Sequence, residues 1–327
     1  MRGSIMTRRR RLAYLVSAIA STGAMAACNT SSGPSAGQGS QPLFGSLTPA
    51  AHDPSVSSPF DATPDLDGSH IYFTAIGASG AGVFEVAAGG GPITTVFAGA
   101  PFVSPLSIAM SSDGKQLLVA DLGAESATAD NGVIFSLPVG GGTPEDLTDA
   151  DGMIPRGLEV SGDTLYFTGS HPGDGLPGVF TMPVGGGPVT TLAKGAPFHD
   201  PSGVAIAKSG DVYVVDTASL ASADARVVKV PVSGAPSVLI DGLAVGYPAG
   251  IVFDMAGSVL LVSALDPTAG TDAVLVIDVA SNAVTEFTTG IDKFIEPAGL
   301  HRAHGADVFA WADSTAGHTG TVYVITR

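Results

Sequence analysis

The stretch Pro201-Ser-Gly-Val-Ala-Ile-Ala-Lys-Ser-Gly-Asp-Val-Tyr-Val-Val-Asp216 decides the fold, because the chain repeats its pattern. Residues 204–206 form an apolar strand, Ser209-Gly210-Asp211 a tight turn, and residues 212–215 a second strand rich in β-branched residues. Residues 227–232 and 237–240 add two more strands around another turn. The repeated unit is therefore a four-stranded meander.

The unit recurs six times, and each copy begins with a proline. These prolines follow one another at intervals of 46 to 50 residues: Pro59, Pro105, Pro155, Pro201, Pro248 and Pro297. Most copies carry a glycine two places after the proline, which lets backbones approach closely near an axis. Repeats of this length built from four short strands are typical of a β-propeller. The sequence therefore predicts an all-β, six-bladed β-propeller.

Closure of the ring is predicted from the two ends of the chain. The last copy stops at Thr321–Arg327, which corresponds to a third strand, so the sixth blade lacks a fourth. Residues around Pro42–Thr48 precede the first copy and are free to supply that outer strand. We expect the propeller to occupy residues 42–327.

The N-terminal residues predict export. The apolar run Leu12–Ala20 follows Arg8–Arg11 and is too short to cross a bilayer, which is typical of a signal peptide over residues 1–27. The segment Met25-Ala26-Ala27-Cys28 resembles the bacterial lipobox, and this resemblance implies that Cys28, the only cysteine, receives lipid. Residues 28–41 would then be a flexible Ser/Gly-rich tether. The alternative is ordinary cleavage after Ala26, which leaves a secreted protein with an unused thiol.

The charge balance restricts the partners. The chain has a net charge of −16, and loss of Arg2 and Arg8–Arg11 with the signal leaves nine basic residues against 30 acidic ones, a net charge of −21. Such a surface repels nucleic acid and anionic lipid. We expect a monomer of the cell envelope that contacts the membrane only through lipid on Cys28, and whose partner is a protein or a small molecule.

Candidate site residues gather at one face of the predicted ring, where the loops that enter the innermost strands meet the loops between second and third strands. Carboxylates there are candidate ligands of Ca²⁺ or another divalent metal, which prefers oxygen donors: Asp200, Asp216, Glu296 and Asp313. Asp216 and Asp313 end strands, so capping of backbone N–H groups is the alternative interpretation. His199 is a candidate catalytic base, or simply part of a solvated loop.

Two titratable residues interrupt the innermost strands. The fourth residue after each proline is apolar or small except in blades three and six, where it is Glu159 and His301. Both are expected to point towards the central channel from opposite sides. A buried pair of this kind has either a structural or a functional role.

The copies that contain Asp121 and Asp216 resemble the NHL-repeat and gluconolactonase-like six-bladed propellers over about residues 50–327. This resemblance implies one divalent metal at the channel mouth, held by a Glu before Gly-Pro, two Asn, one of them within Pro-Asn-Gly, and an Asp. Here Glu296 precedes Pro297 without the glycine, and the Pro-Asn-Gly asparagine is replaced by Arg156, Ser202, Ala249 or Ala298.

Two functions follow from these patterns. The first is a non-enzymatic binding module of the cell surface or periplasm that acts through its acidic loop face. The second is a metal-dependent hydrolase or lactonase that uses the same face, with His199 as base. A purely structural lipoprotein is the third interpretation.

Overall fold

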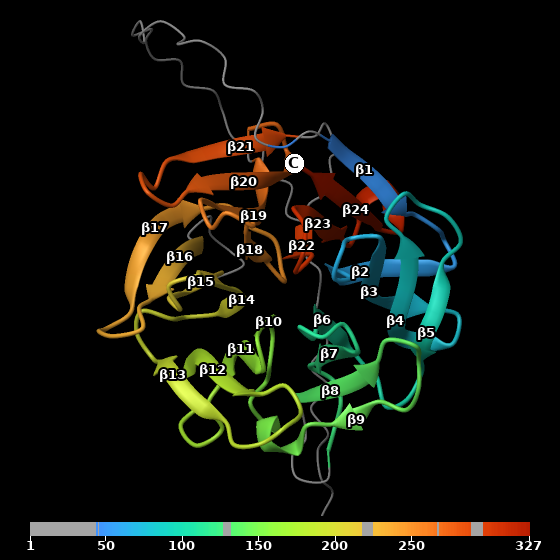
Figure 1. Cartoon of the computed structure of the whole chain (residues 1–327), viewed down its shortest axis with the longest axis horizontal. Helices are drawn as coiled ribbons and strands as arrows, with labels where there is room; N and C mark the ends of the chain where they lie inside the picture. Colours follow the sequence, from blue (N-terminus) through green and yellow to red (C-terminus); the bar gives the residue numbers. More distant parts are fainter. Residues whose placement is uncertain (1–43, 45, 127–131, 218–224, 267, 289–296) are drawn as a thin grey trace, which may run out of the picture. The chain divides into compact units, whose positions relative to one another are not determined.

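Residues 42–327 form one compact unit, a six-bladed β-propeller, in the computed structural model (Figure 1). The structure describes residue 44 and residues 46–126, 132–217, 225–266, 268–288 and 297–327. Each blade is a four-stranded antiparallel sheet whose first strand lies nearest the central axis. The fold predicted from the repeats is confirmed.

The first three blades follow one another along the chain. Blade 1 contains β2 (Val56–Pro64), β3 (His70–Gly77), β4 (Gly80–Ala87) and β5 (Thr94–Ala98). Blade 2 contains β6 (Pro105–Met110), β7 (Gln116–Asp121), β8 (Val133–Pro138) and β9 (Glu145–Asp146), followed by the 3₁₀ turn η1 (Thr148–Ala150). Blade 3 contains β10 (Leu158–Ser161), β11 (Thr164–Ser170), β12 (Pro177–Pro183) and β13 (Thr190–Lys194).

The other three blades complete the ring. Blade 4 contains β14 (Pro201–Ile206), β15 (Val212–Asp216), β16 (Ala225–Val230) and β17 (Ser237–Leu243). Blade 5 contains β18 (Ile251–Phe253), β19 (Val259–Asp266), β20 (Thr271–Asp278) and β21 (Val284–Thr288). Blade 6 contains β22 (Pro297–Arg302), β23 (Val308–Asp313), the 3₁₀ turn η2 (Ala316–His318) and β24 (Thr321–Thr326), with β1 (Ser46–Ala51) outermost.

The N-terminal strand closes the sixth blade, as predicted. β1 pairs antiparallel with β24, from Ser46 opposite Thr326 to Ala51 opposite Val322, and Figure 1 shows the two side by side. β1 begins within the expected segment around Pro42–Thr48 and continues three residues beyond it, to Ala51. Ala50 and Ala51 are its buried residues, so the apolar end of the segment decides which part of it pairs.

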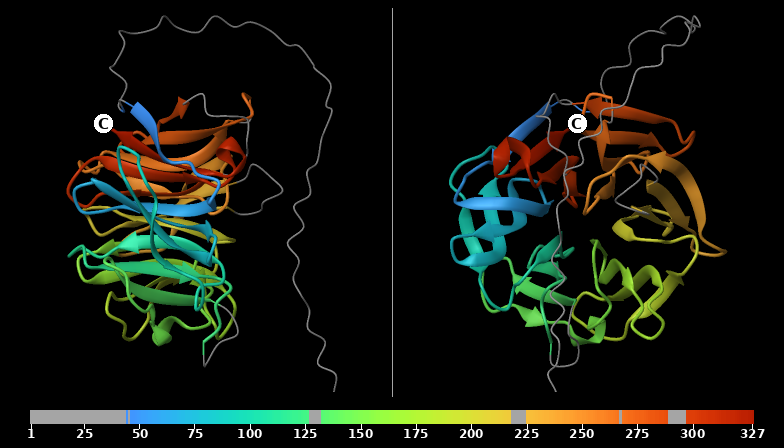
Figure 2. Two further views of the ribbon diagram at one scale, coloured as in Figure 1. Left: turned by 90° about the vertical axis from the view of Figure 1, so that its right-hand side faces the viewer. Right: turned by 180° about the vertical axis from the view of Figure 1, so that it is seen from behind.

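The glycines after the leading prolines allow the innermost strands to crowd around the axis. A Cβ at Gly157 would collide with the backbone oxygen of Ser202, and one at Gly203 with that of Ala249. The view from behind in Figure 2 shows the blades arranged around this axis. Backbones of neighbouring blades therefore approach too closely for any side chain at these positions.

Blades 2, 4 and 6 share one feature at the start of their innermost strands. Pro105, Pro201 and Pro297 are each 96 residues apart, and each pairs with an aspartate at the end of the second strand. In blades 3 and 5 the hydroxyls of Thr168 and Ser263 instead accept the N–H of the glycine that directly precedes the innermost strand. Carboxylates therefore hold the entrances of blades 2 and 4, and hydroxyls those of blades 3 and 5.

Hydrophobic side chains fill the space between blades. Tyr213 in blade 4 meets Phe253 in blade 5 edge-on, with ring centres 5.1 Å apart. Trp311 in blade 6 is fully buried in a cluster that includes Leu261 of blade 5. Burial of this kind stabilises the ring by about 25 cal/mol per Å² of apolar surface. In the described part of the chain, none of the helical segments has the length and hydrophobicity to span a bilayer.

Candidate functional site

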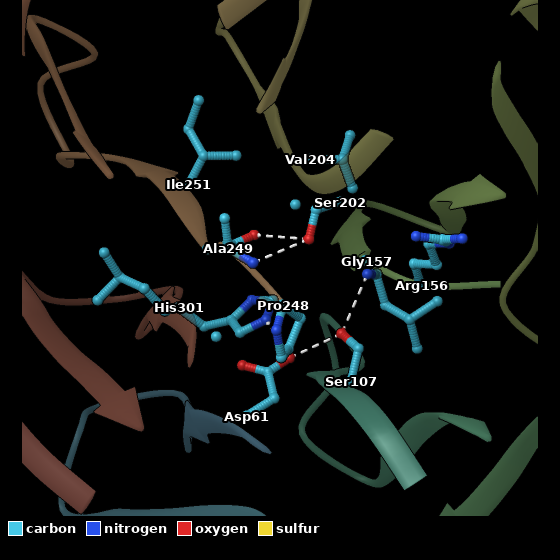
Figure 3. Close-up of a pocket in the computed structure, with 15 residues that line it drawn as sticks. Asp61, Ser107, Arg156, Gly157, Ser202, Val204, Pro248, Ala249, Ile251 and His301 are labelled. Atoms are coloured by element: carbon cyan, nitrogen blue, oxygen red, sulfur yellow. Dashed lines mark hydrogen bonds and ion pairs between the residues drawn. The ribbon is translucent and has the colours of Figure 1, made fainter. Parts of the chain in front are cut away.

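A group of charged residues crosses the central channel, and Figure 3 shows two of them, His301 and Asp61. His301 on β22 contacts two carboxylates, with Nε2 3.0 Å from Oδ2 of Asp61 on β2 and Nδ1 3.3 Å from Oε2 of Glu159 on β10. Glu159 and His301 therefore lie in contact, which shows that the channel is narrow at this level. The cavity that remains there has room for about one water molecule.

Asp61 connects this group to the neighbouring blade. Its Oδ2 also accepts hydrogen bonds from Oγ of Ser107, at 2.7 Å, and from the backbone N of Ile108, at 3.0 Å. The Ser107 hydroxyl in turn accepts the backbone N–H of Leu158 in blade 3, at 3.2 Å. We call Asp61, Ser107, Glu159 and His301 the channel brace, because their contacts link blades 6, 1, 2 and 3.

Electrostatics keep His301 protonated. Burial alone would lower the pKa of His301, but the charge and hydrogen bond of Asp61, together with those of Glu159, raise it to about 10. The side chain of His301 is 9% exposed and that of Asp61 is 3% exposed, so solvent screens their interaction little. At neutral pH His301 is therefore an imidazolium in contact with the side chains of Asp61 and Glu159.

The brace contains the residue types of a hydrolytic triad in an arrangement that does not activate a nucleophile. A triad serine donates to the imidazole, which takes up its proton. Here Ser107 Oγ lies 2.7 Å from the Asp61 carboxylate and donates to it, while both nitrogens of His301 contact carboxylates. The arrangement holds blades together and leaves the hydroxyl without a base.

An ion pair with an aromatic neighbour lies at the mouth of the channel. The guanidinium of Arg156 pairs with the carboxylate of Asp200, and its central carbon lies 5.6 Å from the ring centre of Tyr247, within the range of a cation–π contact. Burial raises the pKa of Asp200, although the charge of Arg156 opposes this shift. Arg156 and His301 are the basic residues that line the channel cavity.

The aspartates that end the second strands of blades 2, 4 and 6 cap backbone N–H groups of loops on the entrance face. Asp216 accepts the N–H of His199, at 2.7 Å, and that of Asp200, at 2.8 Å. Asp121 accepts four backbone N–H groups in the same way, and Asp313 accepts those of Thr315 and Ala316. This is the capping role that the sequence offered as the alternative to metal binding.

Asp313 has a further acidic neighbour. Asp272 on β20 lies beside it, and both residues are fully buried. Burial raises the pKa of Asp313, although the backbone N–H groups of Thr315 and Ala316 oppose this shift. The pair lies between blades 5 and 6.

The structure separates the predicted site residues into three groups. Asp200 is paired with Arg156, Asp216 and Asp313 cap loops, and His199 is exposed at the mouth with only its backbone held by Asp216. Glu159 and His301 belong to the channel brace. Glu296 and Cys28 lie outside the described residues.

The described members of the predicted ligand set, Asp200, Asp216 and Asp313, do not form a metal site by themselves. Among the described residues, no group of three or more His, Cys, Asp or Glu side chains could hold an ion. A cation at Asp200 would have to displace the guanidinium of Arg156. The oxygen-rich cage that a divalent metal such as Ca²⁺ requires is therefore not formed by these side chains.

Asp61, Ser107 and Arg156 are the residues that the sequence-based site prediction missed. Asp61 and Ser107 occupy the place, two residues after the leading proline, where the other four copies have glycine. A Cβ at Gly299 of the adjoining blade would collide with the Asp61 carboxylate, so that glycine provides the space for it. The two copies that lack glycine at this position were therefore the sequence feature that could have indicated the channel brace.

Comparisons with known proteins agree with the fold. No protein-family model and no curated protein matches the chain. Three similar structures illustrate the matches. The PQQ-bound aldose sugar dehydrogenase of Streptomyces coelicolor is 16% identical with a TM-score of 0.59, over 87% of this chain and 99% of that one. A gluconolactonase of Xanthomonas campestris is 16% identical with a TM-score of 0.55, over 86% and 97%.

The third structure comes from a complex of two proteins. A chain of a nidogen/laminin complex is 19% identical with a TM-score of 0.57, over 75% of this chain and 84% of that one. At such low identities these structures share only the fold with this protein, and their functions differ from one another. The chain is therefore similar to six-bladed β-propellers that include both enzymes and a protein found in a complex.

Proposed function

We propose that this protein is an exported binding module whose propeller recognises a protein or a small molecule at the face that carries the entrance loops. In the proposal, residues 1–27 are the signal peptide, Cys28 carries the lipid, and residues 28–41 tether the propeller to the cell envelope. The apolar run Leu12–Ala20 and the single cysteine support this part.

On this face the charged side chains of the channel and its mouth are paired with one another, whereas several apolar side chains are exposed to solvent. This contrast is the observation that supports the proposal. The channel and its mouth hold their charges in the brace and in the Arg156–Asp200 pair. The entrance loops meanwhile leave Val103 60% exposed and Ile154 37% exposed. Apolar and aromatic groups around a polar centre are typical of a binding surface.

Backbone strain at Ile154 points to the same face. Ile154 has φ 51°, a region that a β-branched residue rarely adopts. Such conformations cost on the order of 1–3 kcal/mol and cluster at sites of function. Leu176, 41% exposed in the β11–β12 loop, adds apolar surface to the entrance face in the same blade.

The proposal is tested by photo-crosslinking in cells that export the full-length protein. A photoreactive amino acid replaces Val103 on the entrance face or, as the matched control, Val232, which is 71% exposed in the turn between β16 and β17 on the opposite face. We expect a crosslinked partner from position 103 and none from 232. A small-molecule ligand would instead be seen by native mass spectrometry of the protein purified from those cells.

Other outcomes contradict the proposal. Equal crosslinking at both positions would indicate nonspecific contact. If neither a partner nor a ligand is found, and divalent metal confers esterase or lactonase activity that His199→Ala abolishes, the hydrolase interpretation replaces it. Radiolabelled palmitate that enters Cys28→Ala as well as the wild type would contradict the lipid anchor.

A further inference from the structure

A groove lies between blades 1 and 2 on the face opposite the entrance loops. The β2–β3 and β6–β7 turns form its edges, and the end of β8 contributes to its wall. It has a volume of about 280 Å³ and is lined by Asp65, Leu66, Asp67, Tyr72, Met110, Asp113, Gly114 and Val139. We call this set the Asp65–Asp113 groove. Its size lies close to the lower end of the roughly 300–1,000 Å³ typical of ligand clefts.

The groove is built on fixed hairpins. The Leu66 side chain lies so close to Gly114 that a Cβ on Gly114 would collide with it. The backbone oxygen of Leu66 accepts the N–H of Gly305 in blade 6, at 2.8 Å. His304 beside Gly305 contacts the backbone oxygen of Met110, at 3.1 Å. Turns from three blades therefore hold one another in place around the groove.

Carboxylates and apolar side chains share its lining. Asp65, Asp67 and Asp113 are all ionisable, and no lysine, arginine or histidine is among the lining residues. Leu66 is 36% exposed, and Met110 and Val139 add apolar surface. An occupant that satisfies both features has a positive charge at the end of an apolar stem, which is the structure of an arginine or lysine side chain.

The carboxylates are oriented by their own turns. The Oδ1 atom of Asp67 accepts the N–H of Ser69, at 2.9 Å, and Oδ1 of Asp113 accepts the Ser111 hydroxyl, at 2.8 Å. These serine hydrogen bonds lower the pKa values of both aspartates. Both groups remain negative in neutral solution. The nearby Lys115 that pairs with Asp113 is 77% exposed, so an incoming cation competes with a weak surface ion pair.

We propose that the Asp65–Asp113 groove is a docking site for a protein segment that presents an arginine or lysine next to an apolar residue. The cation would bind between the carboxylates of Asp67 and Asp113, and the apolar residue would lie against Leu66. This site is on the other face of the ring from the entrance loops, and it does not depend on the function proposed for them.

The test measures the affinity of fluorescein-labelled Gly-Leu-Arg-Leu-Gly for the full-length protein by fluorescence anisotropy. A second peptide contains citrulline, which keeps the shape of arginine without its charge. We expect the arginine peptide to bind about tenfold more tightly than the citrulline peptide, since two exposed ion pairs contribute on the order of 1 kcal/mol in total. High salt should reduce this difference.

Matched variants separate the groove from the general acidity of the protein. Asp67→Asn/Asp113→Asn removes two charges from the groove, and the asparagines keep the turn acceptors. Asp163→Asn/Asp241→Asn removes two charges from exposed aspartates outside the groove. Only Asp67→Asn/Asp113→Asn should weaken binding of the arginine peptide about tenfold. Leu66→Ala should weaken binding of both peptides.

Three results would overturn the proposal. Equal loss in the two double variants would show nonspecific attraction to an acidic protein. Equal binding of the two peptides would show that charge is not recognised. Displacement of the peptide by stoichiometric Ca²⁺ would identify the groove as a cation site instead.

Discussion

Nε2 of His301 and Oδ2 of Asp61 lie 3.0 Å apart, although the two residues are 240 positions apart in the sequence. β22, which carries His301, is the innermost strand of the last blade, and β2, which carries Asp61, is that of the first. The ion pair therefore joins the two ends of the ring at the axis, whereas β1 and β24 join them at the rim.

His301→Gln should destabilise the protein by about 3–5 kcal/mol near neutral pH, because it leaves the buried Asp61 and the part-buried Glu159 without their cation. The folded-state pKa of about 10 lies above the ordinary 6.5, so the stabilisation is complete below about pH 6.5 and is lost as the pH rises through about 10. Urea unfolding of wild type and variant across this range measures the difference. His199→Gln, at an exposed histidine, is the control and should change little. A difference that does not vary with pH would contradict a charged His301.

Asp216→Ala should cost about 2–3 kcal/mol, since the N–H groups of His199 and Asp200 lose their acceptor. Asp216→Asn keeps one acceptor oxygen and should cost less. Thermal melts with and without Ca²⁺ distinguish capping from metal binding. Capping predicts no Ca²⁺-dependent rise in the melting temperature. A stoichiometric ion in the purified wild type that is lost in Asp216→Ala would support the metal site instead.

Deletion of residues 46–51 should lower the melting temperature by roughly 10 °C, because it exposes the edge of β24 and the apolar surface under Ala50 and Ala51. Calorimetry of the deletion variant measures the effect. Deletion of residues 29–40, outside the propeller, serves as the control and should leave the transition unchanged. An unchanged melt for the first deletion would show that β1 is not needed for closure.

Asp146→Asn should stabilise the protein at pH 7.5 and have no such effect at pH 4. Burial, together with the negative charge of Asp151, raises the pKa of Asp146 to about 6. A raised carboxyl pKa means that the folded state prefers the proton, so stability falls as the pH rises through about 6. Melting temperatures across this range provide the measurement. Glu145→Gln, at the exposed neighbouring position, should leave the pH profile unchanged.

The repeats contain most of the information about the fold, because each turn and each innermost strand obeys the same local rules. The Gly-Gly-Gly turns are an example: Gly90 and Gly186 adopt φ values of 85° and 88°, as hairpin turns require. Closure by an N-terminal strand followed from the missing strand of the last copy. The first and last residues of β1 could not be predicted in this way, because they depend on which residues are buried when β1 pairs with β24.

The site was less predictable, because contacts between blades depend on the width of the channel. Glu159 and His301 were identified as interruptions of the apolar pattern, but their 3.3 Å contact follows from the crowding that the glycines allow. Asp61 was missed, although it stands at the position where four of the other copies have glycine. Likewise, the Arg156–Asp200 pair joins the entrances of blades 3 and 4, and nothing local in the sequence links these residues.

Closure at both the rim and the axis has a kinetic consequence. If β1 detaches from β24, the Asp61–His301 pair still holds the first and last blades together, so fraying of the N-terminal strand and opening of the ring are separate events. Amide hydrogens of β24 that bond to β1 should then exchange with solvent much faster than those between β22 and β23. A pull on the N-terminus would peel away one strand and leave the rest of the propeller folded.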